Sequence, residues 1–149
     1  MKGRQMELEK KTTILENTYA AVLAEAVTIF TKFGILDKVT SIKAQNAAKS
    51  AKMQVNSFGI RSPEDVFQNL ARVFNCANWQ IEYCEQGFTA KATACKLCGL
   101  TKRMGGDSPC NIYCLNPMKS MVKAIAPEKQ FIVESTLWEN DCCKVKVIE

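Results

Sequence analysis

The sequence predicts an α+β fold in which N-terminal helices pack on an antiparallel sheet of two hairpins with a short helical, cysteine-rich insert. Apolar residues recur at three- and four-residue steps in the first half of the chain, which is typical of amphipathic helices. Two segments of the second half alternate apolar and polar residues around short turns, as the strands of hairpins do. A chain of 149 residues fits a single domain, residues 1–149, with one core.

The first predicted helix begins at a capping box. Thr13 and Glu16 have the spacing in which a threonine caps the helix and a glutamate reaches back to the cap. Gly34 is expected to end the helix, and residues 1–12 are expected to be a frayed terminus. The apolar stripe between these limits is Ile14, Leu15, Tyr19, Val22, Leu23, Ala26, Val27, Phe30 and Phe33.

Two further helices are predicted before the strands. One runs from Asp37 to about Met53 with a thin apolar face. The other begins at Ser62-Pro63-Glu64-Asp65, which provides a serine cap, a proline in the first turn and acidic residues beside it. Its apolar stripe is expected to pack in the core, and Cys76, at its end, is expected to do the same.

The predicted strands form two hairpins. The first pairs the strand from Trp79 with residues 88–95 around Gln86-Gly87. The second pairs Gln130–Trp138 with Cys142–Ile148, and its alternation places Cys143 inward and Cys142 toward solvent. Between the hairpins, Ser108-Pro109 predicts a helix start that puts Cys110 and Cys114 on one face. Asn116-Pro117 is expected to break that turn, and a short helix follows to Ala126.

Composition excludes several classes of function. Twenty basic and fifteen acidic residues give a net charge of +5, but the lysines are scattered, so no nucleic-acid interface is expected. No apolar run reaches the length needed to span a bilayer, so no membrane partner is expected. The N-terminus lacks the apolar segment of a secretory signal, which predicts a cytoplasmic protein with reduced thiols.

Eight cysteines and no histidine define the available chemistry. Four of them form the run Cys95-x2-Cys98-x11-Cys110-x3-Cys114, and such pairs can converge on zinc or hold an iron–sulfur cluster. Two other interpretations remain open. The cysteines can be small buried apolar residues with one or two exposed thiols, or Cys95 and Cys98 can be a redox dithiol.

Two carboxylates complete the candidate site. Glu134 is expected to share a strand face with Trp138, and a carboxylate in that setting can have a raised pKa and act as an acid or base. The alternative is the polar face of an antiparallel strand. Asp107 follows Gly105-Gly106, which is either a tight turn or an anion-binding nest of backbone N–H groups.

The C-terminal half resembles the L-2-amino-thiazoline-4-carboxylic acid hydrolase-like family. The resemblance rests on Cys95 after an alternating strand, on the pair Cys110 and Cys114, and on residues 131–145. Asp141 and Cys143 match that family's Gly-Asp-x-Cys turn, in which Asn140 replaces the glycine. The same ending is similar to vinyl-reductase-type ligand-binding domains, which share an architecture with transport-particle subunits.

The resemblance implies a small-molecule pocket near the cysteine segment and the hydrolytic opening of a thiazoline-like ring. The alternative is a non-enzymatic sensor that binds a small molecule or a metal, and a plain interaction module is a third option. The partner expected in either leading case is a small-molecule substrate or ligand, and self-association into a homo-oligomer is left open. The candidate catalytic residues are Cys95, Cys110, Cys114 and Glu134, with Asp107 as a further proton carrier, and the candidate metal ligands are Cys95, Cys98, Cys110 and Cys114.

Overall fold

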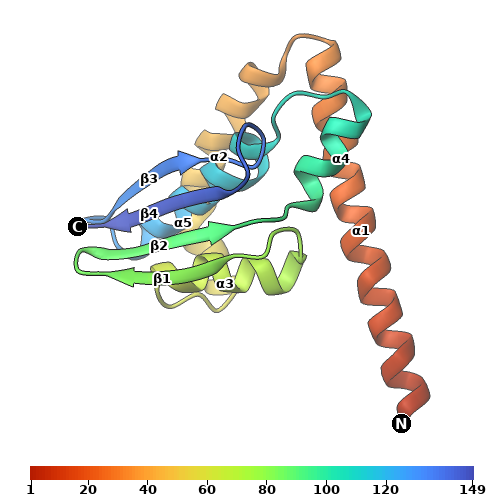
Figure 1. Cartoon of the computed structure of the whole chain (residues 1–149), viewed down its shortest axis with the longest axis horizontal. Helices are drawn as coiled ribbons and strands as arrows, with labels where there is room; N and C mark the ends of the chain where they lie inside the picture. Colours follow the sequence, from red (N-terminus) through yellow and green to blue (C-terminus); the bar gives the residue numbers. More distant parts are fainter.

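A computed structural model describes the whole chain, residues 1–149, as an α+β fold. Figure 1 shows a four-stranded antiparallel sheet with helices against one of its faces and a long first helix at the side. The predicted fold class is therefore confirmed. The helical elements are α1 (Lys2–Lys32), α2 (Leu36–Ser57), α3 (Pro63–Phe74), α4 (Lys96–Met104), the π-helical turn η1 (Asn111–Leu115) and α5 (Asn116–Ile125).

The sheet has the order β1-β2-β4-β3, so the two hairpins meet through their second strands. Ala90 of β2 pairs with Val145 of β4 at the centre. Inward-facing residues of both strands are buried, Cys143 among them, as the alternation predicted. The strands are β1 (Gln80–Cys84), β2 (Gly87–Ala92), β3 (Gln130–Ser135) and β4 (Cys143–Ile148).

Phe67 of α3 joins the helices to the sheet. Its side chain is fully buried, and its ring lies edge-on to Trp79 and Phe88 at centroid distances of 5.2 and 5.7 Å. It also stacks with Phe131 of β3 at 6.1 Å. Aromatic residues from three elements therefore close the core around one side chain.

The start of α3 agrees with the sequence prediction. The Ser62 side chain accepts a hydrogen bond from the backbone N–H of Asp65, and the Asp65 carboxylate accepts one from the backbone N–H of Ser62. These bonds satisfy N–H groups that a helix start leaves without partners. α2, in contrast, continues to Ser57, beyond the predicted end near Met53.

The predicted start of the first helix is wrong. α1 begins at Lys2, and Thr13 lies inside it with its hydroxyl donating to the Glu9 carbonyl. The threonine therefore bonds back along the helix and does not cap it. The predicted end is confirmed, because Gly34 has a φ of 66°, a conformation that glycine adopts without steric cost.

The segment between the hairpins is more helical than predicted. α4 was not expected, and its N-cap residue is Cys95. Asn116-Pro117 does not break the chain either, since helix continues from η1 into α5. Pro117 has no N–H to donate, and the N–H of Asn116 reaches back five residues to the Asn111 carbonyl, which gives the wider π turn.

α1 packs on α4 through small residues. Ala20, Ala24 and Val27 are buried there, and Gly106 approaches so closely that a Cβ atom would lie 2.8 Å from Thr28 Oγ1. This close packing fixes α4, and therefore Cys95, relative to α1. None of the helices combines the length and apolar character needed to cross a membrane.

Candidate functional site

Cys95 occupies the N-terminus of α4. Its Sγ accepts a hydrogen bond from the backbone N–H of Cys98 at 3.5 Å. The free N–H groups and the dipole of a helix N-terminus favour negative charge, so this position stabilises a thiolate. The CxxC spacing has a local cause here, because the second cysteine provides the N–H that meets the first.

A second thiol lies against Cys95. The Cys76 Sγ is 3.9 Å from the Cys95 Sγ. The backbone holds the two residues together, since Ala77 and Cys95 form a β-bridge and the N–H of Lys96 donates to the Cys76 carbonyl at 2.9 Å. Cys76 therefore belongs to the site, and its expected role as simple packing is corrected.

A third contact extends the cluster inward. The Sγ atoms of Cys98 and Cys110 are 3.6 Å apart, and both residues are buried. The cluster formed by Cys76, Cys95, Cys98 and Cys110 is called the thiol cluster below. It links α4, the start of η1 and the segment after α3.

Thiols and thiolates alternate along the thiol cluster. A hydrogen bond from the Cys76 thiol lowers the pKa of Cys95, and the backbone N–H groups of Cys98 and Leu97 lower it further. Donating to Cys95 raises the pKa of Cys76, and donating to Cys110 raises the pKa of Cys98. Burial raises both values further. The pKa of Cys110 falls to about 7 because it accepts from Cys98. The thiolate form of Cys95 is thus favoured by one thiol donor, Cys76, and by the N–H groups at the start of α4.

Cys114 and Cys143 lie outside this arrangement. Burial holds the pKa of Cys114 well above its usual value, and its thiol donates to Met118 Sδ at 3.5 Å. Burial also raises the pKa of Cys143 to about 11, although its sulfur accepts from the N–H of Leu137 at 3.1 Å. Both side chains are protonated at neutral pH and packed.

No metal-binding group is found among the thiols. No group of three or more cysteine or acidic side chains is arranged to hold a metal ion. Cys114 is directed to Met118, away from Cys95, Cys98 and Cys110. The zinc ion or iron–sulfur cluster stays a prediction from the sequence, and no step below depends on one.

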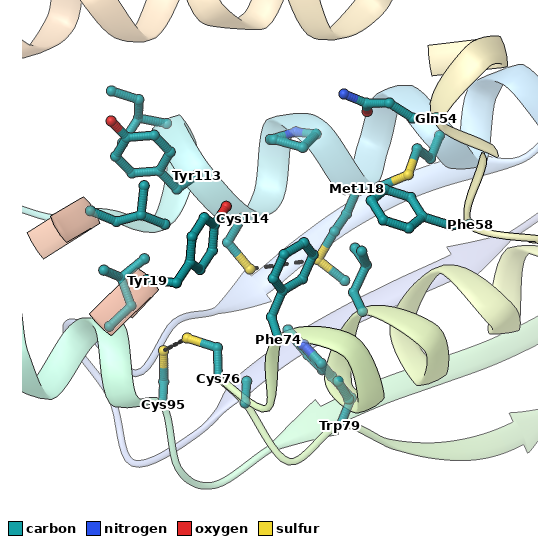
Figure 2. A pocket seen from close by; sticks show the side chains of 18 of the residues that line it. Tyr19, Gln54, Phe58, Phe74, Cys76, Trp79, Cys95, Tyr113, Cys114 and Met118 are labelled. Carbon is teal, nitrogen blue, oxygen red and sulfur yellow. Dashed lines mark hydrogen bonds between the residues drawn. The ribbon is translucent and has the colours of Figure 1, made fainter. Parts of the chain in front are cut away.

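An apolar cavity of about 330 Å³ opens beside the thiol cluster. Figure 2 shows Tyr19, Cys76 and Cys95 at one end of it and Gln54 and Phe58 at the other. Cys114 also lines the cavity, although it is not a member of the thiol cluster. The remaining lining residues are Leu23, Lys43, Leu70, Ala71, Phe74, Ala77, Trp79, Leu97, Ile112, Tyr113, Pro117, Met118 and Met121.

A few polar groups reach this cavity. Lys43 Nζ lies 5.0 Å from the centroid of the Tyr113 ring and makes no ion pair. Burial raises the pKa of Tyr19 and of Tyr113, so both remain neutral hydroxyl donors. No carboxylate lines the cavity. An apolar chamber with one cation and neutral donors suits an apolar ligand with an anionic end.

The two candidate carboxylates lie elsewhere. Glu134 forms ion pairs with Lys146 and Lys144 on the solvent face of the sheet, and these two lysines lower its pKa. The expectation of a raised pKa is therefore wrong. Ile132 pairs with Lys146, so strand alternation puts Glu134 on the same face as the two lysines, which is the polar-face alternative that the sequence left open. Asp107 is exposed, and its N–H donates to Thr31 Oγ1, so Gly105-Gly106 forms a packed turn.

Sequence reasoning identified Cys95 and Cys114 as site residues and missed Cys76, Lys43, Tyr19 and Tyr113. Periodicity alone identifies Tyr19 as a core residue of a helix, and Lys43 as one lysine among many. Only the tertiary arrangement brings α1, α2 and η1 to one cavity. In comparisons with known proteins, no family model, curated protein or solved structure matches this chain.

Proposed function

We propose that this protein binds a small apolar molecule with one anionic end, and that the Cys95 thiolate faces that molecule. The cavity beside the thiol cluster carries this proposal. Its volume of about 330 Å³ lies within the range of small-molecule sites, and its walls are apolar with a few convergent polar groups.

Lys43 supports the anionic end. It is the one cationic side chain among the lining residues, and no carboxylate of the chain forms an ion pair with it. A carboxylate or sulfonate in the cavity would gain a charge-assisted hydrogen bond there. The neutral hydroxyls of Tyr19 and Tyr113 would donate to the same anion.

The test uses the fluorescent probe 1-anilinonaphthalene-8-sulfonate, an apolar anion. We expect one probe to bind per chain. Ala71→Phe places a ring in the cavity and should weaken binding at least tenfold, whereas Gln68→Phe, on the exposed side of the same helix, should leave it unchanged. Lys43→Gln should weaken binding about tenfold by removing the cation. Equal affinity of all four proteins would refute the proposal.

A second candidate is the ring-opening hydrolysis that the resemblance implies, and the pair Cys95 and Cys76 favours it. The Cys95 thiolate would attack the amidine carbon of a thiazoline carboxylate and form a C–S bond. The ring C–S bond would break with its electrons on the departing sulfur, which would take the proton of Cys76. Water would then displace Cys95 and leave an opened ureido product. Lys43 would hold the substrate carboxylate.

Turnover separates the two candidates. If the protein hydrolyses 2-aminothiazoline-4-carboxylate, Cys95→Ser should abolish product formation and retain substrate binding. If the protein binds the naphthalene sulfonate but does not hydrolyse the thiazoline, the result favours a non-enzymatic small-molecule sensor.

A further inference from the structure

α1 carries an exposed apolar stripe whose d positions are largely uncovered by the rest of the chain. Its d positions, which repeat every seven residues, are Leu8, Leu15, Val22 and Ile29, and these side chains are 57%, 59%, 55% and 46% exposed. The a positions are Gln5, Thr12, Tyr19, Ala26 and Phe33, of which Tyr19 and Phe33 are large, apolar and exposed and Ala26 is half-buried. This three–four alternation is the seam of a coiled coil.

The d positions of the seam lie away from the contact with α4, whereas Tyr19 at an a position also packs on Phe74, and Glu16 beside the seam accepts a hydrogen bond from Asn75 Nδ2 at 3.0 Å. α1 packs on α4 through Ala20, Ala24 and Val27, which lie more than a quarter turn of the helix from the seam. Figure 1 shows the N-terminal half of α1 projecting beyond the other elements. Every residue from 1 to 15 is exposed, and a helix segment of this length is marginal in water without a partner.

We propose that two copies of this chain associate through α1 as a parallel coiled coil. The area is sufficient, since the large side chains of the seam expose on the order of 600 Å² per copy, and a pair would bury about 1,200 Å², the lower end of specific interfaces. The seam continues to Phe33, so the contact extends from the projecting half to the body.

Charge supports a parallel arrangement. The residues that flank the seam in its first two heptads are basic on one side, Arg4 and Lys11, and acidic on the other, Glu9 and Glu16. In a parallel pair, the g position of one helix faces the following e position of its partner. Arg4 would face Glu9, and Lys11 would face Glu16, in both directions across the dimer.

An antiparallel pair is less complementary. In an antiparallel pair with α1 centred on its partner, Glu16 of one copy would face Glu16 of the other. Arg4 would face Lys32. Its one attractive flanking pair would be Lys11 with Glu25. The two arrangements therefore predict different effects of Glu25→Lys: no change in a parallel dimer, and loss of association in an antiparallel one.

The dimer would also complete the wall of the cavity. Tyr19 is an a-position residue of the seam and a lining residue of the cavity, where its ring stacks on Phe74 at 5.0 Å. Its outer face is exposed, at 46% of the side chain, in the single chain. Pairing would cover that face and restrict the tyrosine.

Sedimentation equilibrium of the full chain at micromolar concentration tests the proposal. We expect a dimer whose dissociation constant rises at least a hundredfold in Leu15→Glu and changes little in Lys10→Glu, a charge reversal on the outer face of α1. Circular dichroism checks the fold, which these exposed sites should preserve. A wild-type monomer at 100 µM, or a Leu15→Glu dimer of unchanged affinity, would overturn the proposal.

A charge exchange tests the arrangement without removing apolar contacts. The variant Arg4→Glu/Lys11→Glu has acidic flanks only, and Glu9→Lys/Glu16→Lys has basic flanks only. Each alone should associate at least tenfold more weakly than the wild type, and an equimolar mixture should form a heterodimer. Absence of the heterodimer, or loss of the dimer in Glu25→Lys, would refute parallel pairing.

Discussion

The Sγ atoms of Cys76 and Cys95 lie 3.9 Å apart at the wall of the cavity, the first after α3 and the second at the N-terminus of α4. The two thiols differ in protonation because their surroundings differ. Cys95 accepts hydrogen bonds from the N–H of Cys98 and from the thiol of Cys76, and Cys76 is partly buried beside it. The pair therefore places a nucleophile and a proton donor side by side.

Alkylation by iodoacetamide should show this asymmetry. The lowered pKa of Cys95 means that its thiolate persists as the pH falls below 9.0, the ordinary value. Its alkylation rate should change less than threefold between pH 8 and pH 6, whereas that of free cysteine in solution falls nearly a hundredfold. Peptide mapping by mass spectrometry measures each site.

Cys76→Ala provides the matched control. This change removes the donor that contributes most to the lowered pKa of Cys95, so the rate at pH 6 should fall by at least fivefold. A Cys95 rate that follows free cysteine in the wild type would show that the thiol cluster does not activate it.

Cys142 should react before Cys143. Cys143 is 7% exposed on the inner face of β4, and burial raises its pKa to about 11, so it is a protonated thiol at pH 8. Cys142, just before this strand, is less buried than Cys143. We expect more than a tenfold difference in alkylation rate, and faster labelling of Cys143 would indicate a one-residue slip of the strand.

Two glycines should respond oppositely to alanine. A Cβ at Gly106 would lie 2.8 Å from Thr28 Oγ1 and 2.9 Å from Thr101 Cγ2. Both threonines are bonded to their own helices, so α1 and α4 must separate. We expect a loss of about 1–3 kcal/mol in the free energy of unfolding. Gly99→Ala meets no neighbour and should gain about 1 kcal/mol in helix propensity. Urea unfolding measures both.

The sequence was most informative where local rules decide the structure. The Ser62 capping box, the end of α1 at Gly34 and the inward face of β4 follow from cap chemistry, left-handed geometry and strand alternation. The start of α1 was misplaced because a threonine inside a helix satisfies the same spacing rule as a cap.

The site was only partly predictable. Cys95 was identified by its spacing from Cys98, yet its partner Cys76 lies nineteen positions away and meets it through a bridge that no local pattern encodes. For Glu134, the polar strand face, one of the two sequence interpretations, is confirmed, but the ion pairs with Lys144 and Lys146 depend on the pairing of β3 with β4. Lys43 could not be identified from the sequence as a binding residue, because its role depends on a cavity wall without carboxylates that only the tertiary structure shows.

One measurement tests most directly whether the cavity binds an apolar anion beside a reactive thiolate. The reagent is an iodoacetamide attached to a naphthalene sulfonate, applied at pH 6.5 and followed by peptide mapping. We predict saturable modification of Cys95, slowed by excess anilinonaphthalene sulfonate and by Ala71→Phe. First modification of the exposed Cys84, without saturation or competition, would contradict the account.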